Sequence, residues 1–187
     1  MTIGAAPRPR SLLRARIVLA GLSACGLAAL AWVSFMQPDA RVIYNPSDSV
    51  AVGWYRVDSS GRRTDSLPVG SIVLTRLPDA VALFAAQRGY LPTGIPLLKR
   101  VGAVAPQEVC VTDGAVRIDG VPVAVALHTD RMGRSLRAWP GCRRLRPGEL
   151  FLLSTTNPAS FDSRYFGPIA ASAVLGVAHS LWLETGR

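Results

Sequence analysis

The sequence predicts a mainly β domain, with a twisted antiparallel sheet or barrel and one or two short helices, behind a single N-terminal transmembrane helix. A long uncharged segment lies near the N-terminus, and short segments rich in β-branched residues follow it. Turn-forming pairs such as Asn45-Pro46 and Asp119-Gly120 lie before or within them. The chain has 187 residues, 49% of them hydrophobic, and a mean hydropathy of +0.27. These values predict one folded domain plus a membrane segment.

The uncharged segment covers residues 17–36. At about 1.5 Å per residue, a helix of this length crosses a hydrocarbon core of ~30 Å. An arginine cluster precedes it, so the positive-inside rule predicts a cytoplasmic tail at 1–16 and an external domain at 37–187. A cleaved signal peptide is the alternative, but this segment is longer than a usual signal-peptide core and its small residues lie inside it.

The external domain begins with a turn at Asn45–Asp48, after which Val50, Val52 and Trp54 alternate with other residues and predict a strand. Pro78 in the first turn and Gly89 as a stop predict a helix over Ala80–Gln87. Alternation and β-branched content predict further strands at Ser71–Leu77, Leu97–Ala105, Leu150–Ser154 and Val174–Leu183. Val109–Val111 and Ala115–Val125 are predicted to form a hairpin, with Asp119-Gly120 as a turn.

Two serines, Ser47 and Ser49, lie in the turn before the first predicted strand. Proline fixes its own φ, and Asn, Ser and Asp bond to nearby backbone, so the turn presents its serines rather than burying them. A serine hydroxyl is nearly inert at neutral pH and needs a partner base within hydrogen-bond reach. Ser49 is therefore a candidate nucleophile only if another part of the chain supplies a base, since most turn serines are simply solvated.

Lys99 is the only lysine in the chain and lies between Leu98 and Val101 in a strand pattern. Burial disfavours a charged amine and lowers a lysine pKa by roughly 3–5 units, which produces a general base near neutral pH. A surface lysine on an edge strand is the alternative. The apolar neighbours of Lys99 favour the buried base.

A dense polar and aromatic block, residues 157–169, follows the predicted strand Leu150–Ser154. Asp162 lies two positions before Arg164, and on a strand or extended loop such a pair can bind and hold each other in place. A structural loop with an ion pair and aromatic packing is the alternative interpretation.

Three sequence blocks, in the order described above and after a membrane anchor, resemble those of the membrane-anchored Ser/Lys signal peptidases of type I. Among these the chain is most similar to the short conjugative-transfer peptidases of the TraF type. Asn45–Tyr55 resembles the nucleophile block, Leu98–Val101 the base block and Ser160–Arg164 the last block. The resemblance covers nearly all of the chain and implies a signal-peptidase-like fold. The chain is too short for the large extra β subdomain of some leader peptidases, which favours the conjugative type.

The resemblance implies a serine endopeptidase with Ser49 as nucleophile and Lys99 as general base. The supporting residues that it implies are Ser47 for the oxyanion hole, Ser160 to orient the lysine, and Asp162 and Arg164 to brace the site. Residues 37–187 would then be a periplasmic catalytic domain on a single-pass anchor in the bacterial inner membrane. The chain departs from the family pattern at Val50 and Ala51, where Met and Pro are usual.

The implied activity is removal of signal or leader peptides at small-residue sites, with a pilin precursor or another secreted precursor as substrate. The lipid bilayer and proteins of a conjugation apparatus are the other expected partners, and cyclisation of the product stays open. Alternatives are a general type I signal peptidase and a non-catalytic anchored assembly subunit. A Ser-His-Asp hydrolase would need His128, which lies in a polar loop, or His179, which we interpret as a packed core histidine.

The cysteines and charges bear on compartment and partners. Cys110 and Cys142 lie in the external domain and predict a disulfide in an oxidising periplasm, worth roughly 3–4 kcal/mol for a loop of that size. Two buried free thiols are the alternative. The histidines and cysteines lack metal-site spacing, so we expect no metal and no cofactor. The net charge is +9, yet no basic run is interleaved with aromatic residues, so we expect no nucleic-acid partner.

Overall fold

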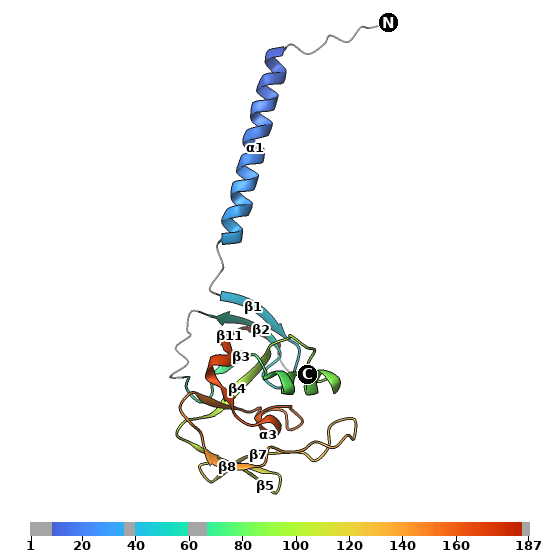
Figure 1. Ribbon diagram of the computed structural model, residues 1–187, viewed down its shortest axis with the longest axis vertical. Helices are drawn as coiled ribbons and strands as arrows, with labels where there is room; N and C mark the ends of the chain where they lie inside the picture. The colour runs from blue at the N-terminus through green and yellow to red at the C-terminus, as the bar shows by residue number, and fades with distance from the viewer. Residues whose placement is uncertain (1–8, 36–39, 60–66, 185–187) are drawn as a thin grey trace. The chain divides into compact units, whose positions relative to one another are not determined.

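The computed structural model describes residues 9–35, 40–59 and 67–184, and the chain divides into two units at Pro38 (Figure 1). The first unit contains helix α1, Pro9–Phe35. Within it Leu12–Trp32 is long and apolar enough to cross a membrane, and no other helix of the described residues is. The helix therefore starts earlier than predicted, while the predicted end at Met36 lies outside the described residues.

The second unit is mainly β, as predicted, and all of its strand pairs are antiparallel. The larger sheet has the order β1-β2-β11-β3-β4-β9-β10. Its strands are β1 (Ala40–Asn45), β2 (Gly53–Asp58), β3 (Ile72–Thr75), β4 (Leu97–Val104), β9 (Glu149–Leu152), β10 (Ile169–Ala170) and β11 (Val174–Leu183).

A smaller sheet has the order β7-β6-β5-β8. Its strands are β5 (Glu108–Thr112), β6 (Ala115–Ile118), β7 (Val121–Val125) and β8 (Gly141–Arg144). The helices of this unit are α2 (Asp79–Gln87), α3 (Ser163–Phe166) and the short 3-10 helix η2 (Ala171–Ala173). Figure 1 shows α3 between the larger sheet and β7 of the smaller one.

The predicted strands are present, with one correction. The strand expected from Val50 onward begins at Gly53, and Val50 is instead buried in the loop before it, in an apolar cluster with Tyr55 and Leu98. The predicted turn at Asp119-Gly120 is confirmed, and it divides Ala115–Val125 into β6 and β7. The loop that carries the two serines is therefore anchored in the core by Val50.

Gly53 allows β11 to approach the end of this loop. Its φ is +146°, and a Cβ at this position would lie 2.2 Å from the Trp182 carbonyl oxygen. Any other residue would clash with the β11 backbone, so the start of β2 depends on glycine.

Candidate active site

The loop between β1 and β2 is held from the inside by Asn45, which is 5% exposed. The Asn45 side-chain amide donates to the carbonyl oxygens of Ser47 at 2.7 Å, Ala51 at 3.0 Å and Val50 at 3.3 Å. Its Oδ1 accepts from the backbone N–H of Ser47. One side chain thus fixes the whole turn, in the manner of an Asx turn.

Ser47 and Ser49 face each other in this loop, with their Oγ atoms 2.9 Å apart. Ser47 Oγ also donates to Asn45 Oδ1 at 3.1 Å. Ser49 is 7% exposed, so it is more buried than the predicted surface turn would make it. Within the described residues the backbone N–H of Ser49 donates no hydrogen bond, which leaves it available to an incoming group.

Lys99 is buried at 3% exposure in β4, which lies inside the larger sheet between β3 and β9. Its Nζ donates to Ser160 Oγ at 2.5 Å. Burial lowers the pKa of Lys99 from 10.5 to about 8, opposed by the charges of Asp162 and Asp48 and aided by that of Arg164. Lys99 is therefore not a surface lysine on an edge strand, and its neutral form is accessible near physiological pH.

Asp162 and Arg164 form a fully buried ion pair, with Arg164 Nε 2.8 Å from Asp162 Oδ1. The pairing agrees with the prediction, but the local structure is a helix start rather than a strand or extended loop. Asp162 caps α3 by accepting from the backbone N–H of Arg164, and it also accepts from that of Ser154. A short capped turn brings the two side chains together because a carboxylate is a good N-cap acceptor.

The Arg164 guanidinium also binds the backbone of the loop that carries Ser160. It donates to the carbonyl oxygens of Asn157, Pro158 and Ser160 in this loop, and to that of Val125 at the end of β7, at 2.9 to 3.2 Å. The position of Ser160, and with it the hydrogen bond from Lys99, is therefore tied to Arg164.

The loop that carries Ser47 and Ser49 meets the loop between β9 and α3 through Asp48, the residue before Ser49. The Asn157 side-chain amide donates to Asp48 Oδ1 at 2.5 Å, and Thr156 Oγ1 donates to the Asp48 carbonyl oxygen at 3.0 Å. All six predicted site residues thus lie in one connected network. Within the described residues no hydrogen bond joins Ser49 directly to Lys99: Ser49 bonds to Ser47, and Lys99 bonds to Ser160.

Three contributing residues were not predicted from the sequence. Tyr55 is fully buried and its hydroxyl donates to the Ala51 carbonyl oxygen at 2.6 Å. Ser163 Oγ accepts from the backbone N–H of Leu152, which fixes α3 against β9. The third, Asn157, links the two loops as described above. The sequence signal that was available is the cluster of Asn and Ser around each block.

Neither histidine contacts the two serines. His179 is exposed on β11, where its Nε2 lies 3.7 Å from Asp58 Oδ2, so its interpretation as a core histidine is wrong. The alternation along β11 continues past the region that the core covers, which is why the pattern misled. His128 is exposed in the loop after β7.

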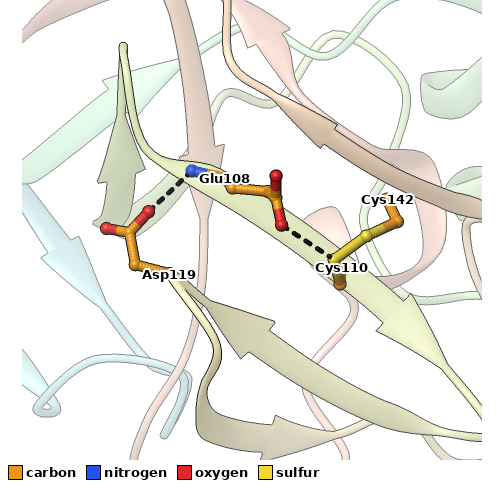
Figure 2. Close-up of a disulfide and its surroundings, with 4 residues drawn as sticks. All are labelled: Glu108, Cys110, Asp119 and Cys142. Atoms are coloured by element: carbon orange, nitrogen blue, oxygen red, sulfur yellow. Dashed lines mark hydrogen bonds between the residues drawn. A yellow bond between two sulfur atoms is a disulfide. The ribbon is translucent and has the colours of Figure 1, made fainter.

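Cys110 and Cys142 are directly opposite each other on β5 and β8 and are joined by a disulfide, as predicted (Figure 2). Glu108 Oε1 lies 3.7 Å from Cys110 Sγ. These three residues are the one group among the described residues whose ligand atoms are close enough to share a metal ion. Because both sulfurs are in the disulfide, no thiolate is available, and we assign no metal to the group.

The site thus combines a serine in a fixed loop with a buried lysine of lowered pKa, and the two are connected through the backbone at Asp48 and the hydrogen bonds of Asn157, Arg164 and Ser160. The family described as signal peptidase, peptidase S26, matches residues 14–183. The chain therefore belongs to this family.

Three relatives are proteins named for plasmid or conjugal transfer. A plasmid transfer protein TraF from Escherichia coli is 35% identical over 86% of this chain and 89% of its own length. A probable conjugal transfer protein TraF from Sinorhizobium fredii is 34% identical over 90% of both chains. A conjugal transfer protein TraF from Agrobacterium fabrum is 38% identical over 76% of this chain and 81% of its own length.

Among solved structures, a signal peptidase I from Enterococcus faecalis V583 covers 60% of this chain and 96% of its own chain. The sequence identity is 22% and the TM-score is 0.32. This likeness is weak and adds nothing to the family assignment.

Proposed function

We propose that the protein is a membrane-anchored serine endopeptidase that removes leader peptides, with Ser49 as nucleophile and Lys99 as general base. The observation that carries the proposal is the state of Lys99: it is buried, its pKa is lowered to about 8, and its Nζ bonds to Ser160. A base with a pKa near the working pH is the most effective proton acceptor.

In the proposed reaction Ser49 Oγ attacks the scissile carbonyl carbon and neutral Lys99 takes its proton. Ser160 accepts one N–H of the amine and so restricts the orientation of the lysine side chain. Catalytic hydrogen bonds often form only when substrate is bound, which accounts for the absence of a direct Ser49–Lys99 bond within the described residues. Lys99 then gives the proton to the leaving amine, and water hydrolyses the acyl-enzyme.

The oxyanion of the tetrahedral intermediate is assigned to the Ser49 N–H and the Ser47 hydroxyl. Asn45 supports this role, since it ties the loop carbonyls inward and orients Ser47. Removing one oxyanion donor of this kind typically raises the activation barrier by about 2.7–4 kcal/mol. The proposed supporting roles of Asp162 and Arg164 are to fix the loop that presents Ser160.

The proposed substrate is a pilin precursor of a conjugation apparatus, which the names of the relatives support. In this proposal residues 17–36 anchor the chain in the bacterial inner membrane, residues 1–16 are cytoplasmic, and residues 37–187 are the periplasmic catalytic domain. The disulfide supports an oxidising compartment for that domain.

The test is co-expression of the full chain with candidate pilin precursors. We expect a size shift of one precursor that disappears with Ser49→Ala and persists with Ser59→Ala, a serine directly after β2. Processing that continues in a folded Ser49→Ala protein would show that Ser49 is not the nucleophile.

A further inference from the structure

A small hairpin, residues 128–136, lies between β7 and β8 and takes no part in the chemistry described above. Its ends are joined by the bridge between Thr129 and Ser135. Asp130 closes its tip, since Oδ1 accepts from the backbone N–H groups of Met132 and Arg134, both at 2.9 Å. The hairpin is therefore an ordered element rather than a loose connection.

Asp130 also fastens the hairpin to the segment after α2. The Asp130 side chain is 5% exposed and its Oδ2 accepts from Tyr90 at 2.5 Å and from Arg134 Nε at 2.7 Å. Desolvation of Asp130 opposes its ionisation, but these hydrogen bonds outweigh it and lower its pKa far below the ordinary value. The charge that holds the hairpin is thus present across the physiological pH range.

The same contacts reach the catalytic network. Arg134 donates to the Arg88 carbonyl oxygen at 2.8 Å, and Arg88 donates to that of Ser135 at 3.0 Å. The Tyr90 ring packs on Phe161, with centroids 5.1 Å apart. Since Phe161 lies between Ser160 and Asp162, the hairpin is connected to the site through the Tyr90 side chain.

At the tip of this hairpin Arg131 extends toward the nucleophile loop. Its guanidinium lies 3.7 Å from Asp48 Oδ2, and its side chain is 71% exposed. The other Asp48 oxygen is already bound by Asn157. An exposed pair of this kind contributes little, so a second carboxylate can recruit the guanidinium at small cost. Its planar donors suit a carboxylate.

We propose that Arg131 is a specificity-determining residue, which selects peptides that carry an Asp or Glu side chain within about two residues of the scissile bond. This proposal rests on the proposed function, because it takes Ser49 as the point of cleavage. Asp48 directly precedes Ser49, and an extended peptide advances about 3.3 Å per residue. A side chain one or two residues from the scissile carbonyl would therefore fall within reach of Arg131.

The test measures binding rather than cleavage. The full chain carrying Ser49→Ala, in detergent micelles, is titrated into fluorescein-labelled peptides that share a small-residue cleavage site. The peptides differ at one position beside that site, as Glu, Gln or Lys, and fluorescence anisotropy gives each Kd. We expect the Glu peptide to bind about tenfold more tightly than the Lys peptide at low salt, and the preference to vanish at 1 M salt.

Arg131→Glu should reverse the preference, whereas Arg137→Glu should keep it. Arg137 is exposed on the same loop and gives the same change in charge. Equal affinity for the Glu and Lys peptides, no binding of any peptide, or an equal effect of Arg137→Glu would overturn the proposal. Equal weakening of all three peptides by Arg131→Glu would assign the arginine a structural role instead.

These outcomes are independent of the nucleophile. If precursor processing persists with Ser49→Ala, the proposed chemistry fails while the charge preference is still measured. If processing requires Ser49 but the peptides bind equally, the chemistry stands and the role of Arg131 fails.

Discussion

The two halves of the site are held by different forces. The serine loop is fixed by neutral hydrogen bonds from Asn45 and Tyr55 to its carbonyl oxygens. The lysine side is fixed by a fully buried ion pair, Asp162 and Arg164. Neutral bonds contribute roughly 1 kcal/mol each, whereas breaking a buried pair leaves an uncompensated charge. Substitutions that remove a hydrogen bond in the serine loop should therefore mainly reduce activity, whereas substitutions that break the ion pair should strongly destabilise the folded domain.

The largest expected effect separates charge from proton transfer at Lys99. Arginine keeps the positive charge but cannot lose its proton, so Lys99→Arg removes the base and retains a cation. We expect Lys99→Arg and Lys99→Ala to lose about 10²–10⁴-fold in precursor processing, the usual contribution of a general base. Matched expression and thermal unfolding are the controls. Substantial processing by folded Lys99→Arg would remove the general-base assignment.

The next effect concerns stability. Arg164→Leu leaves Asp162 buried without its partner and should destabilise the domain by about 3–5 kcal/mol, measured by denaturant unfolding of the full chain in detergent. Arg143→Leu is the matched control, because its pair with Glu149 is partly exposed and should contribute about 1 kcal/mol or less. Similar losses for the two variants would contradict the contrast between buried and exposed pairs.

The pH dependence of the rate follows from the lowered pKa of Lys99. Only the neutral amine accepts a proton, and the protonated form dominates below about pH 8. We expect kcat/KM to fall about tenfold for each pH unit below that value and to level off above it. A rate that stays constant from pH 6 to pH 8 in the stably folded enzyme would argue against a titrating lysine.

The smallest effect tests the serine loop. Tyr55→Phe removes one donor to the Ala51 carbonyl oxygen, which Asn45 still binds. We expect a few-fold lower kcat and a loss of folding stability of about 0.5–1.5 kcal/mol, which is well below the loss expected for Arg164→Leu. Tyr44→Phe is the control, since that hydroxyl donates to Glu184 at an exposed position. A drop in stability as large as that of Arg164→Leu would contradict the proposed difference between the serine loop and the lysine side.

Much of this fold could be predicted from local pattern. The alternation in Leu97–Ala105 and Val174–Leu183 marks β4 and β11, and Pro78 with Gly89 marks α2. The described strands that were missed are β1, which has six residues, and the shorter β8 and β10, which have four and two. In β8, Gly141–Arg144, two of four residues are arginines, and its pairing depends on β5 rather than on its own sequence.

The candidate site was predictable as a set of residues but not as a network. Sequence order indicated Ser49, Lys99 and Arg164. It could not indicate that Asn157 would bond to Asp48, because that contact joins positions far apart in the chain. Nor could it show that Asp162 starts a helix, since a four-residue helix has no periodic signal.

The burial of the only lysine also has a consequence for chemical labelling. Every other cation in the described part of the β domain is an arginine or a histidine, so amine reagents meet a single side-chain target there, and it is enclosed. Acylating reagents attack the neutral amine, which is the form that the site stabilises. A mass increase at Lys99 would thus report how often the enclosed centre opens to solvent, because Lys99 is the single lysine that such a reagent can modify.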